Sequence, residues 1–236
     1  MYNLTNLTVA DVVKCRQMLR ELGDGAKSLE ELAVRIVQYF YNLFGDDQTG
    51  EHAIALSRLY KTCSYEKLDS EFRDFAQVML GSEPATPDLK CLTLLATTGE
   101  RIEWNSPRRS AGHKAIPLPS EKVVTQLPMI AQLVKQFGLT ISEVLRPNPN
   151  LIRDMAEKTY NVFHVEEAVG SKYVPAQEGF VIPYGIKSVV GFGGILPQGE
   201  LYAVILFSKQ TISKEVADQF KVLALGVKTL ILAALW

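Results

Sequence analysis

The histidines of this chain are the first residues to test for chemistry, because an imidazole can bind a metal ion or transfer a proton near neutral pH. His52, His113 and His164 are far apart in the sequence, and none belongs to a pattern that would place two imidazoles on one helical face. Metal binding is therefore not indicated. Strand alternation would send Val162, His164 and Glu166 to one face, so His164 is either a hydrogen-bonded structural residue or a ligand contact.

A glycine-rich run, Gly191-Phe192-Gly193-Gly194, is a second place where chemistry could occur. Dinucleotide-binding glycines are followed directly by a helix, and a phosphate-binding P-loop also needs a Lys-Ser or Lys-Thr pair. Here Ile195-Leu196-Pro197 follows, and the next expected element is a strand. The glycines are therefore predicted to allow close backbone packing or a bulge in a sheet.

Nucleophilic catalysis has no recognisable motif in this sequence. No Gly-x-Ser-x-Gly elbow occurs, and no nucleophile is paired with a base. The cysteines, Cys15, Cys63 and Cys91, are widely spaced and odd in number, which excludes a complete disulfide framework and indicates a reducing compartment. Cys91 opens an apolar strand, where a thiol behaves as a small hydrophobic group. We predict a protein that is not an enzyme, with an uncharacterised enzyme as the weakest alternative.

A small-molecule pocket needs a few polar groups among apolar walls. Five residues with a polar tip beside an apolar run form the predicted ligand-binding set: Trp104, Arg146, His164, Tyr184 and Lys187. For Arg146 and Lys187 the alternative is simple exposure to solvent, and for Tyr184 it is packing within a loop. The sequence does not specify a cofactor.

The composition indicates a packed soluble protein. The 236 residues are 47% hydrophobic and 22% charged, with a formal net charge of -1. This balance gives no electrostatic drive toward nucleic acid. The most apolar run, residues 222–236, contains Lys228 and is shorter than the roughly 20 residues of a membrane span. The first residues lack the pattern of a signal peptide, so a cytoplasmic protein is expected.

Capping residues and apolar periodicity predict the elements of the first 104 residues. An N-terminal helical pair begins at Thr8 and at Ser28. A buried strand is expected within residues 50–62, with a short helix as the alternative. A helix is expected over 69–80, followed by a hairpin whose strands, 90–97 and 100–104, flank Thr98-Gly99.

The middle of the chain is less regular. Residues 105–119 are predicted to form a surface excursion or a lid. A helix begins at Ser120, is broken or restarted at Pro128 and ends at Gly138. After a proline-rich turn at residues 146–150, a short helix around 151–156 and a strand over 160–165 are expected.

The last 57 residues carry the strongest pattern: apolar strands over 188–196 and 201–207, a Pro197-Gln198-Gly199 turn, and an apolar helix over 213–236. The second half of that helix is apolar nearly all round, so it must be buried on two sides. A homodimer interface, which we favour, or packing between the sheet and the N-terminal helices would provide this burial.

This order of elements resembles the closing half of a GAF domain, a small-molecule sensory module of bacterial signalling proteins. The resemblance implies an α+β fold: a GAF/PAS-like antiparallel sheet flanked by helices, with an N-terminal helical pair and a long C-terminal helix. Residues 1–27 would be a helical extension, and residues 28–236 the sensory domain with a long insertion around 105–150. The Cys-His dipeptide that attaches bilins in some family members is absent.

The function implied by the resemblance is that of a cytoplasmic sensor in signal transduction, such as a two-component system. It would bind a small molecule or cofactor and pass a signal through dimeric terminal helices to a kinase or cyclase output domain. The alternative from a different class is a dimerisation or interaction module that binds no ligand.

Overall fold

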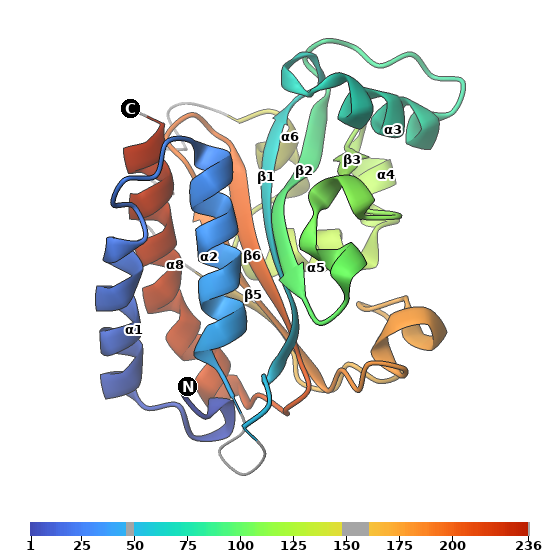
Figure 1. The fold of residues 1–236 in the computed structure, drawn as a ribbon. Helices are drawn as coiled ribbons and strands as arrows, with labels where there is room; N and C mark the ends of the chain where they lie inside the picture. Colours follow the sequence, from blue (N-terminus) through green and yellow to red (C-terminus); the bar gives the residue numbers. More distant parts are fainter. Residues whose placement is uncertain (46–49, 148–160, 236) are drawn as a thin grey trace.

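A computed structural model describes residues 1–45, 50–147 and 161–235, and it shows one sheet between two layers of helices (Figure 1). Within these residues the sheet has six strands in the order β3-β2-β1-β6-β5-β4, and every neighbouring pair is antiparallel. The strands are β1 (Ile54–Ser64), β2 (Lys90–Gly99), β3 (Ala115–Pro117), β4 (Val162–Val165), β5 (Ser188–Ile195) and β6 (Leu201–Ser208).

The two faces of the sheet are covered differently. Two long helices, α2 (Leu29–Leu43) and α8 (Lys214–Ala234), pack on the face that we call proximal, and a third, α1 (Val9–Glu21), packs against α8 on this side. The opposite, distal face carries three short helices, α4 (Glu121–Thr125), α5 (Pro128–Gln136) and α6 (Ile141–Leu145). A further helix, α3 (Ser70–Leu80), packs beside β3. Both faces are apolar, and the predicted α+β arrangement, an antiparallel sheet flanked by helices with a long C-terminal helix, is confirmed.

Five capped helices begin where the sequence predicted, whereas α6, which begins after Thr140, was not predicted. The side chains of Thr8, Ser28, Asp69, Ser120 and Ser213 each accept a hydrogen bond from a backbone N–H in the first turn of α1, α2, α3, α4 and α8. These bonds satisfy donors that the start of a helix leaves without a partner, so each cap fixes a boundary locally. The predicted restart at Pro128 is also confirmed, since it is the first residue of α5.

The hairpin predicted around Thr98-Gly99 is wrong. β2 runs through both residues and pairs with β1, where Gly99 lies opposite Leu56. A 3-10 helix, η3 (Ile102–Asn105), takes the place of the expected second strand. The Asn105 side chain accepts a hydrogen bond from the Gly99 N–H at 3.0 Å and donates one to its carbonyl at 3.1 Å, so it supplies the bonds that a partner strand would make.

The strand predicted over 160–165 is present as β4, whereas the helix predicted around 151–156 lies outside the described residues. The predicted role of the glycine run is confirmed. It lies inside β5, and a Cβ placed on Gly193 would be 2.0 Å from the carbonyl oxygen of Tyr202 in β6. Close backbone packing therefore requires glycine at this position.

The C-terminal helix is buried on two sides within a single chain. One side of α8 packs on the sheet, where the Tyr202 hydroxyl donates a hydrogen bond to the Ala224 carbonyl at 2.9 Å. The other side contacts α1 and α2, and the Leu19 side chain approaches closely at Gly226. Of the two sequence-based explanations, packing against the N-terminal helices therefore accounts for the apolar character of α8. None of the described helices is long and apolar enough to cross a membrane.

Candidate functional site

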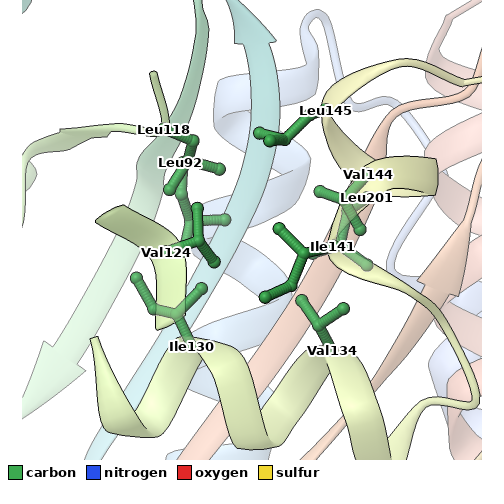
Figure 2. A pocket seen from close by; sticks show the side chains of 9 residues that line it. All are labelled: Leu92, Leu118, Val124, Ile130, Val134, Ile141, Val144, Leu145 and Leu201. Atoms are coloured by element: carbon green, nitrogen blue, oxygen red, sulfur yellow. The ribbon is translucent and has the colours of Figure 1, made fainter. Parts of the chain in front are cut away.

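The distal face encloses a cavity between the sheet and its three short helices (Figure 2). Leu92 of β2 and Leu201 of β6 form its floor, and aliphatic side chains of α4, α5 and α6 form most of the remaining wall. Its volume is about 10 Å³, which is room for about one water molecule. A larger ligand could enter only if the short helices moved away from the sheet.

A more open hollow lies on the outer side of α5. It has a volume of about 420 Å³ and is lined by residues of α4 and α5 together with Lys172 and Tyr173 of the loop after β4. The Lys172 ammonium lies 5.2 Å from the centre of the Tyr173 ring, a cation–π contact. Val134 and Ile141 line both this hollow and the closed cavity, so only a thin apolar wall separates the two spaces.

Two of the predicted ligand-binding residues, Trp104 and Tyr184, meet on the distal face. Their ring centres are 4.5 Å apart in an edge-to-face arrangement, and Phe180 lies 5.4 Å from Trp104 and 5.0 Å from Phe207 of β6. Phe207 is six residues from Leu201, which places this cluster about 20 Å from the closed cavity along β6. The rings pack against one another, in line with the loop-packing alternative for Tyr184.

His164 forms part of a hydrogen-bonded connection between α5 and α8. Its Nε2 atom lies 2.8 Å from the Ile212 carbonyl, two residues before α8 begins, and a carbonyl can only accept, so Nε2 carries a proton. Its backbone N–H donates to the Gln136 side-chain oxygen at 2.9 Å. The predicted alternation is confirmed because Phe163 and Val165 are buried in the distal cluster, whereas His164 points the other way.

Ser188 is a further residue in this connection, and sequence reasoning missed it. Its hydroxyl donates to the Glu166 carbonyl at 2.6 Å and accepts from the Ile212 N–H at 2.9 Å. The segment before α8 is therefore held by both β4 and β5. The available signal was a serine at the start of a strand whose other residues are apolar or glycine.

Arg146 and Lys187 are both exposed. The backbone N–H of Arg146 closes α6 by donating to Ser142, and that of Lys187 donates to Ser208 beside β5. The five predicted residues thus do not form one pocket. Trp104 and Tyr184 lie on the distal face, and His164 points toward the side occupied by α8.

The sequence analysis also missed a polar group at the centre of the distal face. Arg58 of β1 pairs with Thr97 of β2 on one side and with Ile205 of β6 on the other. Its neighbours on the same face, Leu56 and Tyr60, are buried in the distal cluster. The signal was a charged residue inside a strand that is otherwise buried. In the described part of the chain, no group of three or more His, Cys, Asp or Glu residues is placed to hold a metal ion.

The cysteines are free, and burial suppresses their ionisation. Loss of hydration raises the pKa of Cys15 to about 11 and that of Cys91 to about 12. At pH 8 less than about one thiol in a thousand at either position is therefore ionised. Both side chains belong to apolar clusters, which agrees with the prediction that Cys91 acts as a small hydrophobic group.

We expect thiol labelling with a disulfide reagent at pH 8 to modify the folded chain first at Cys63, the half-buried cysteine. Cys15 and Cys91 should react only at the rate of opening, because the thiolate is the nucleophile and neither side chain is exposed. The matched control is Cys63→Ser, which should lose the fast phase while all remaining thiols react in urea. A fast-reacting thiol in Cys63→Ser would contradict this expectation.

Comparisons with known proteins found similarity at the level of structure. The chain matches no protein-family model and no curated protein. A GAF domain from an Acinetobacter phosphoenolpyruvate-protein phosphotransferase is 13% identical, with 94% of each chain covered and a TM-score of 0.46. The phycoerythrobilin-bound GAF domain of a cyanobacterial phytochrome is 12% identical, with 97% of this chain and 99% of that chain covered and a TM-score of 0.40.

Proposed function

We propose that this chain is a sensory or regulatory module of a signalling protein, which binds a small molecule at the distal face and passes the change to α8. The observation that carries this proposal is the hydrogen-bonded connection from Gln136 through His164 to Ile212. It joins the last residue of α5, a helix that lines the distal cavity, to the segment that starts α8. A shift of α5 would therefore act on the start of α8.

The closed cavity supports a mechanism in which binding moves the short helices. Ile130 and Val134 of α5 contribute to the cavity wall, and Gln136 follows within one turn. A ligand that occupied this space would push α5 outward, because a cavity of about 10 Å³ has no room for it. The hydrogen bond from the His164 N–H to the Gln136 side chain would then either pull β4 along with α5 or break.

A homodimer and an output domain complete the proposal. Val222 and Leu225 are exposed on the outer face of α8, and Val9 and Val13 are exposed on α1, which lies beside α8. Pairing of these faces between two copies would place two C-terminal helices side by side, a suitable path toward a kinase or cyclase domain. The proposed location is the cytoplasm. The second function is a ligand-free interaction module, favoured by the small size of the cavity.

Native mass and the absorption spectrum of the purified chain test the proposal first. A bound small molecule or a visible chromophore would support sensing, whereas a ligand-free dimer would favour the interaction module. If the chain is purified without a ligand, it is screened by thermal shift against nucleotides, amino acids, organic acids and aromatic compounds. A compound that raises the Tm is then used as the ligand. A ligand that stabilises the chain but leaves hydrogen exchange over residues 212–220 unchanged would argue against the transmission step.

The variant Gln136→Met should weaken the connection without changing the cavity wall. Loss of one hydrogen bond is worth about 1 kcal/mol, so amide exchange at the start of α8 should become roughly fivefold faster. Gln132→Met is the matched control, since Gln132 lies one turn earlier in α5 and makes no hydrogen bond to β4 among the described residues. Equal exchange in the two variants would show that Gln136 does not influence α8.

A further inference from the structure

Arg58 carries a positive charge in the middle of a largely apolar surface, and no carboxylate of the described residues is paired with it. None of the ion pairs found among the described residues includes Arg58, whereas Arg35, Arg101 and Arg108 are each paired with an acid. Its Nε atom is shielded from solvent and has no hydrogen-bond partner in the part of the chain that the structure describes. Leaving such a donor without an acceptor is costly, because a charged group loses more hydration than a neutral one.

Thr97 provides a second polar group of the same kind. It lies directly opposite Arg58 across the β1–β2 pair, so the two side chains emerge side by side on the distal face. Only 4% of Thr97 is exposed, and its hydroxyl has no hydrogen-bond partner in the described part of the chain. A valine would fill this position at no such cost. Arg58 and Thr97 are therefore two adjacent donors for which the described residues supply no acceptor.

The other groups near Arg58 do not neutralise it. Its Nη1 atom donates to the Tyr60 hydroxyl at 3.2 Å, which leaves the hydroxyl proton of Tyr60 able to donate to a further acceptor. Loss of hydration and the nearby positive charge of Arg58 both lower the pKa of His113, which lies in the loop before β3. His113 is therefore neutral near pH 7 and cannot repel an anion.

We propose that Arg58 and Thr97 form a binding site for the oxyanion group of a small molecule, either a carboxylate or a phosphate. A guanidinium offers parallel N–H donors that fit two oxygens of such a group, and the Thr97 hydroxyl lies beside it to donate a third hydrogen bond. This proposal rests on the proposed function in one respect. If the sensed molecule binds at the distal face, the site at Arg58 and Thr97 implies that this molecule carries a carboxylate or a phosphate.

The site lies between two features of the distal face that are described above: the aromatic cluster around Trp104 and the closed cavity. The side chains of Leu56 in β1 and of Trp104 both lie beside Gly99. Arg58 and Tyr60 follow along β1 toward the end of β6 that lines the closed cavity. An anionic group held at Arg58 would therefore place the body of its molecule against apolar side chains on either side. Ser110, which is 6% exposed with an unpartnered hydroxyl, lies on the loop that leads to His113.

Nitrogen-15 NMR of the arginine side chains tests the site directly. The full chain is titrated with inorganic phosphate and, separately, with acetate, at constant ionic strength set with sodium chloride. We expect a saturable shift of the Arg58 Nε–H signal, assigned by its absence in Arg58→Lys, and the more effective anion identifies the source. Absence of a saturable shift with both anions would overturn the proposal.

Variants distinguish specific hydrogen bonding by Arg58 and Thr97 from a general attraction of anions to positive charge. Binding followed through the β1 and β2 amide signals should weaken roughly tenfold or more in Arg58→Gln, and by a smaller factor in the isosteric Thr97→Val. Arg20→Gln is the matched control, because Arg20 is an exposed arginine of α1, on the opposite side of the sheet. Equal weakening in Arg20→Gln and Arg58→Gln would show nonspecific attraction and overturn the site.

Stability gives a second, independent measurement. In a buffer without oxyanions, Arg58→Met should have a Tm at least equal to that of the native chain, because it removes an unpaired, partly buried charge. Phosphate or acetate should then raise the Tm of the native chain and leave that of Arg58→Met unchanged. A large fall in the Tm of Arg58→Met without anions would show that the guanidinium is already satisfied within the fold.

The result also distinguishes this site from the proposed sensory function. Anion binding at Arg58 without any change in amide exchange over residues 212–220 would support the site and contradict transmission to α8. Conversely, a sensed molecule that binds Arg58→Gln as tightly as the native chain would preserve the sensory function and overturn the role of Arg58.

Discussion

Gly193→Ala is expected to destabilise the fold by about 3 kcal/mol or more. The added Cβ would lie 2.0 Å from the Tyr202 carbonyl oxygen and 2.8 Å from the Ala203 Cα. Both are backbone atoms of β6, so no change of side-chain rotamer can relieve the contact, and β5 must move away from its partner strand. Thermal unfolding followed by circular dichroism should show a Tm lower by roughly 6–12 °C or more.

Gly112→Ala is the matched control for this substitution. A Cβ at Gly112 would meet nothing within 4 Å, and the residue does not adopt a positive φ, so its stability should change by less than about 0.5 kcal/mol. If Gly193→Ala were as stable as Gly112→Ala, the close spacing of β5 and β6 at this position would be incorrect.

The starts of all described α-helices except α6 could be predicted from the sequence because their causes are local. A cap such as Thr8 or Ser213 acts within three residues of itself, and the hydrogen bonds seen in the structure are those that the sequence pattern implies. The strands β5 and β6 were predictable for a related reason. They are apolar runs joined by a turn, where Gly199 adopts a positive φ of 82°.

The end of β2 could not be predicted in this way. A Thr98-Gly99 pair between apolar runs favours a hairpin, yet its outcome depends on Asn105, whose side chain bonds both backbone groups of Gly99. Propensity alone does not anticipate that a side chain will replace a strand, because the competing bonds form only after the following residues fold back. Local reasoning therefore predicted the wrong partner for Gly99.

The candidate site was predictable only in part. Trp104 and Tyr184 were chosen for the same local reason, and their contact across 80 residues depends on how the loops fold over β6. The choice of Arg146 and Lys187 followed from residue type, and neither position is buried. Arg58 belongs to no motif, and it becomes notable only when its neighbours across the sheet are known, because burial and pairing are tertiary properties.

The two-sided burial of α8 could also be predicted only in part from the sequence. Its apolar second half predicted two contact surfaces but not their source, since a second copy of the chain and the N-terminal helices provide similar apolar surface. The close contact of Leu19 with Gly226 identifies α1 as one of the surfaces. What remains available for a second copy is the outer stripe that includes Val222 and Leu225.

Lys61→Met is expected to destabilise the chain by about 3 kcal/mol, because it leaves Glu200 without its partner. The Lys61 ammonium and the Glu200 carboxylate form an ion pair between β1 and the turn before β6, with side chains 10% and 14% exposed. Removing one partner of a buried pair leaves a charge that is neither hydrated nor neutralised. Urea unfolding should show a lower midpoint, with a slope unchanged from the native chain.

The double substitution Lys61→Met with Glu200→Leu should recover most of this loss, to within about 1 kcal/mol of the native chain, because no unpaired charge remains. The control is the exposed pair Lys221–Asp218 on α8, where Lys221→Met should cost less than about 1 kcal/mol. A double variant as unstable as Lys61→Met would mean that the Lys61 ammonium stabilises the fold through contacts other than Glu200. One such contact could be the Thr62 carbonyl, which lies 3.5 Å from the ammonium.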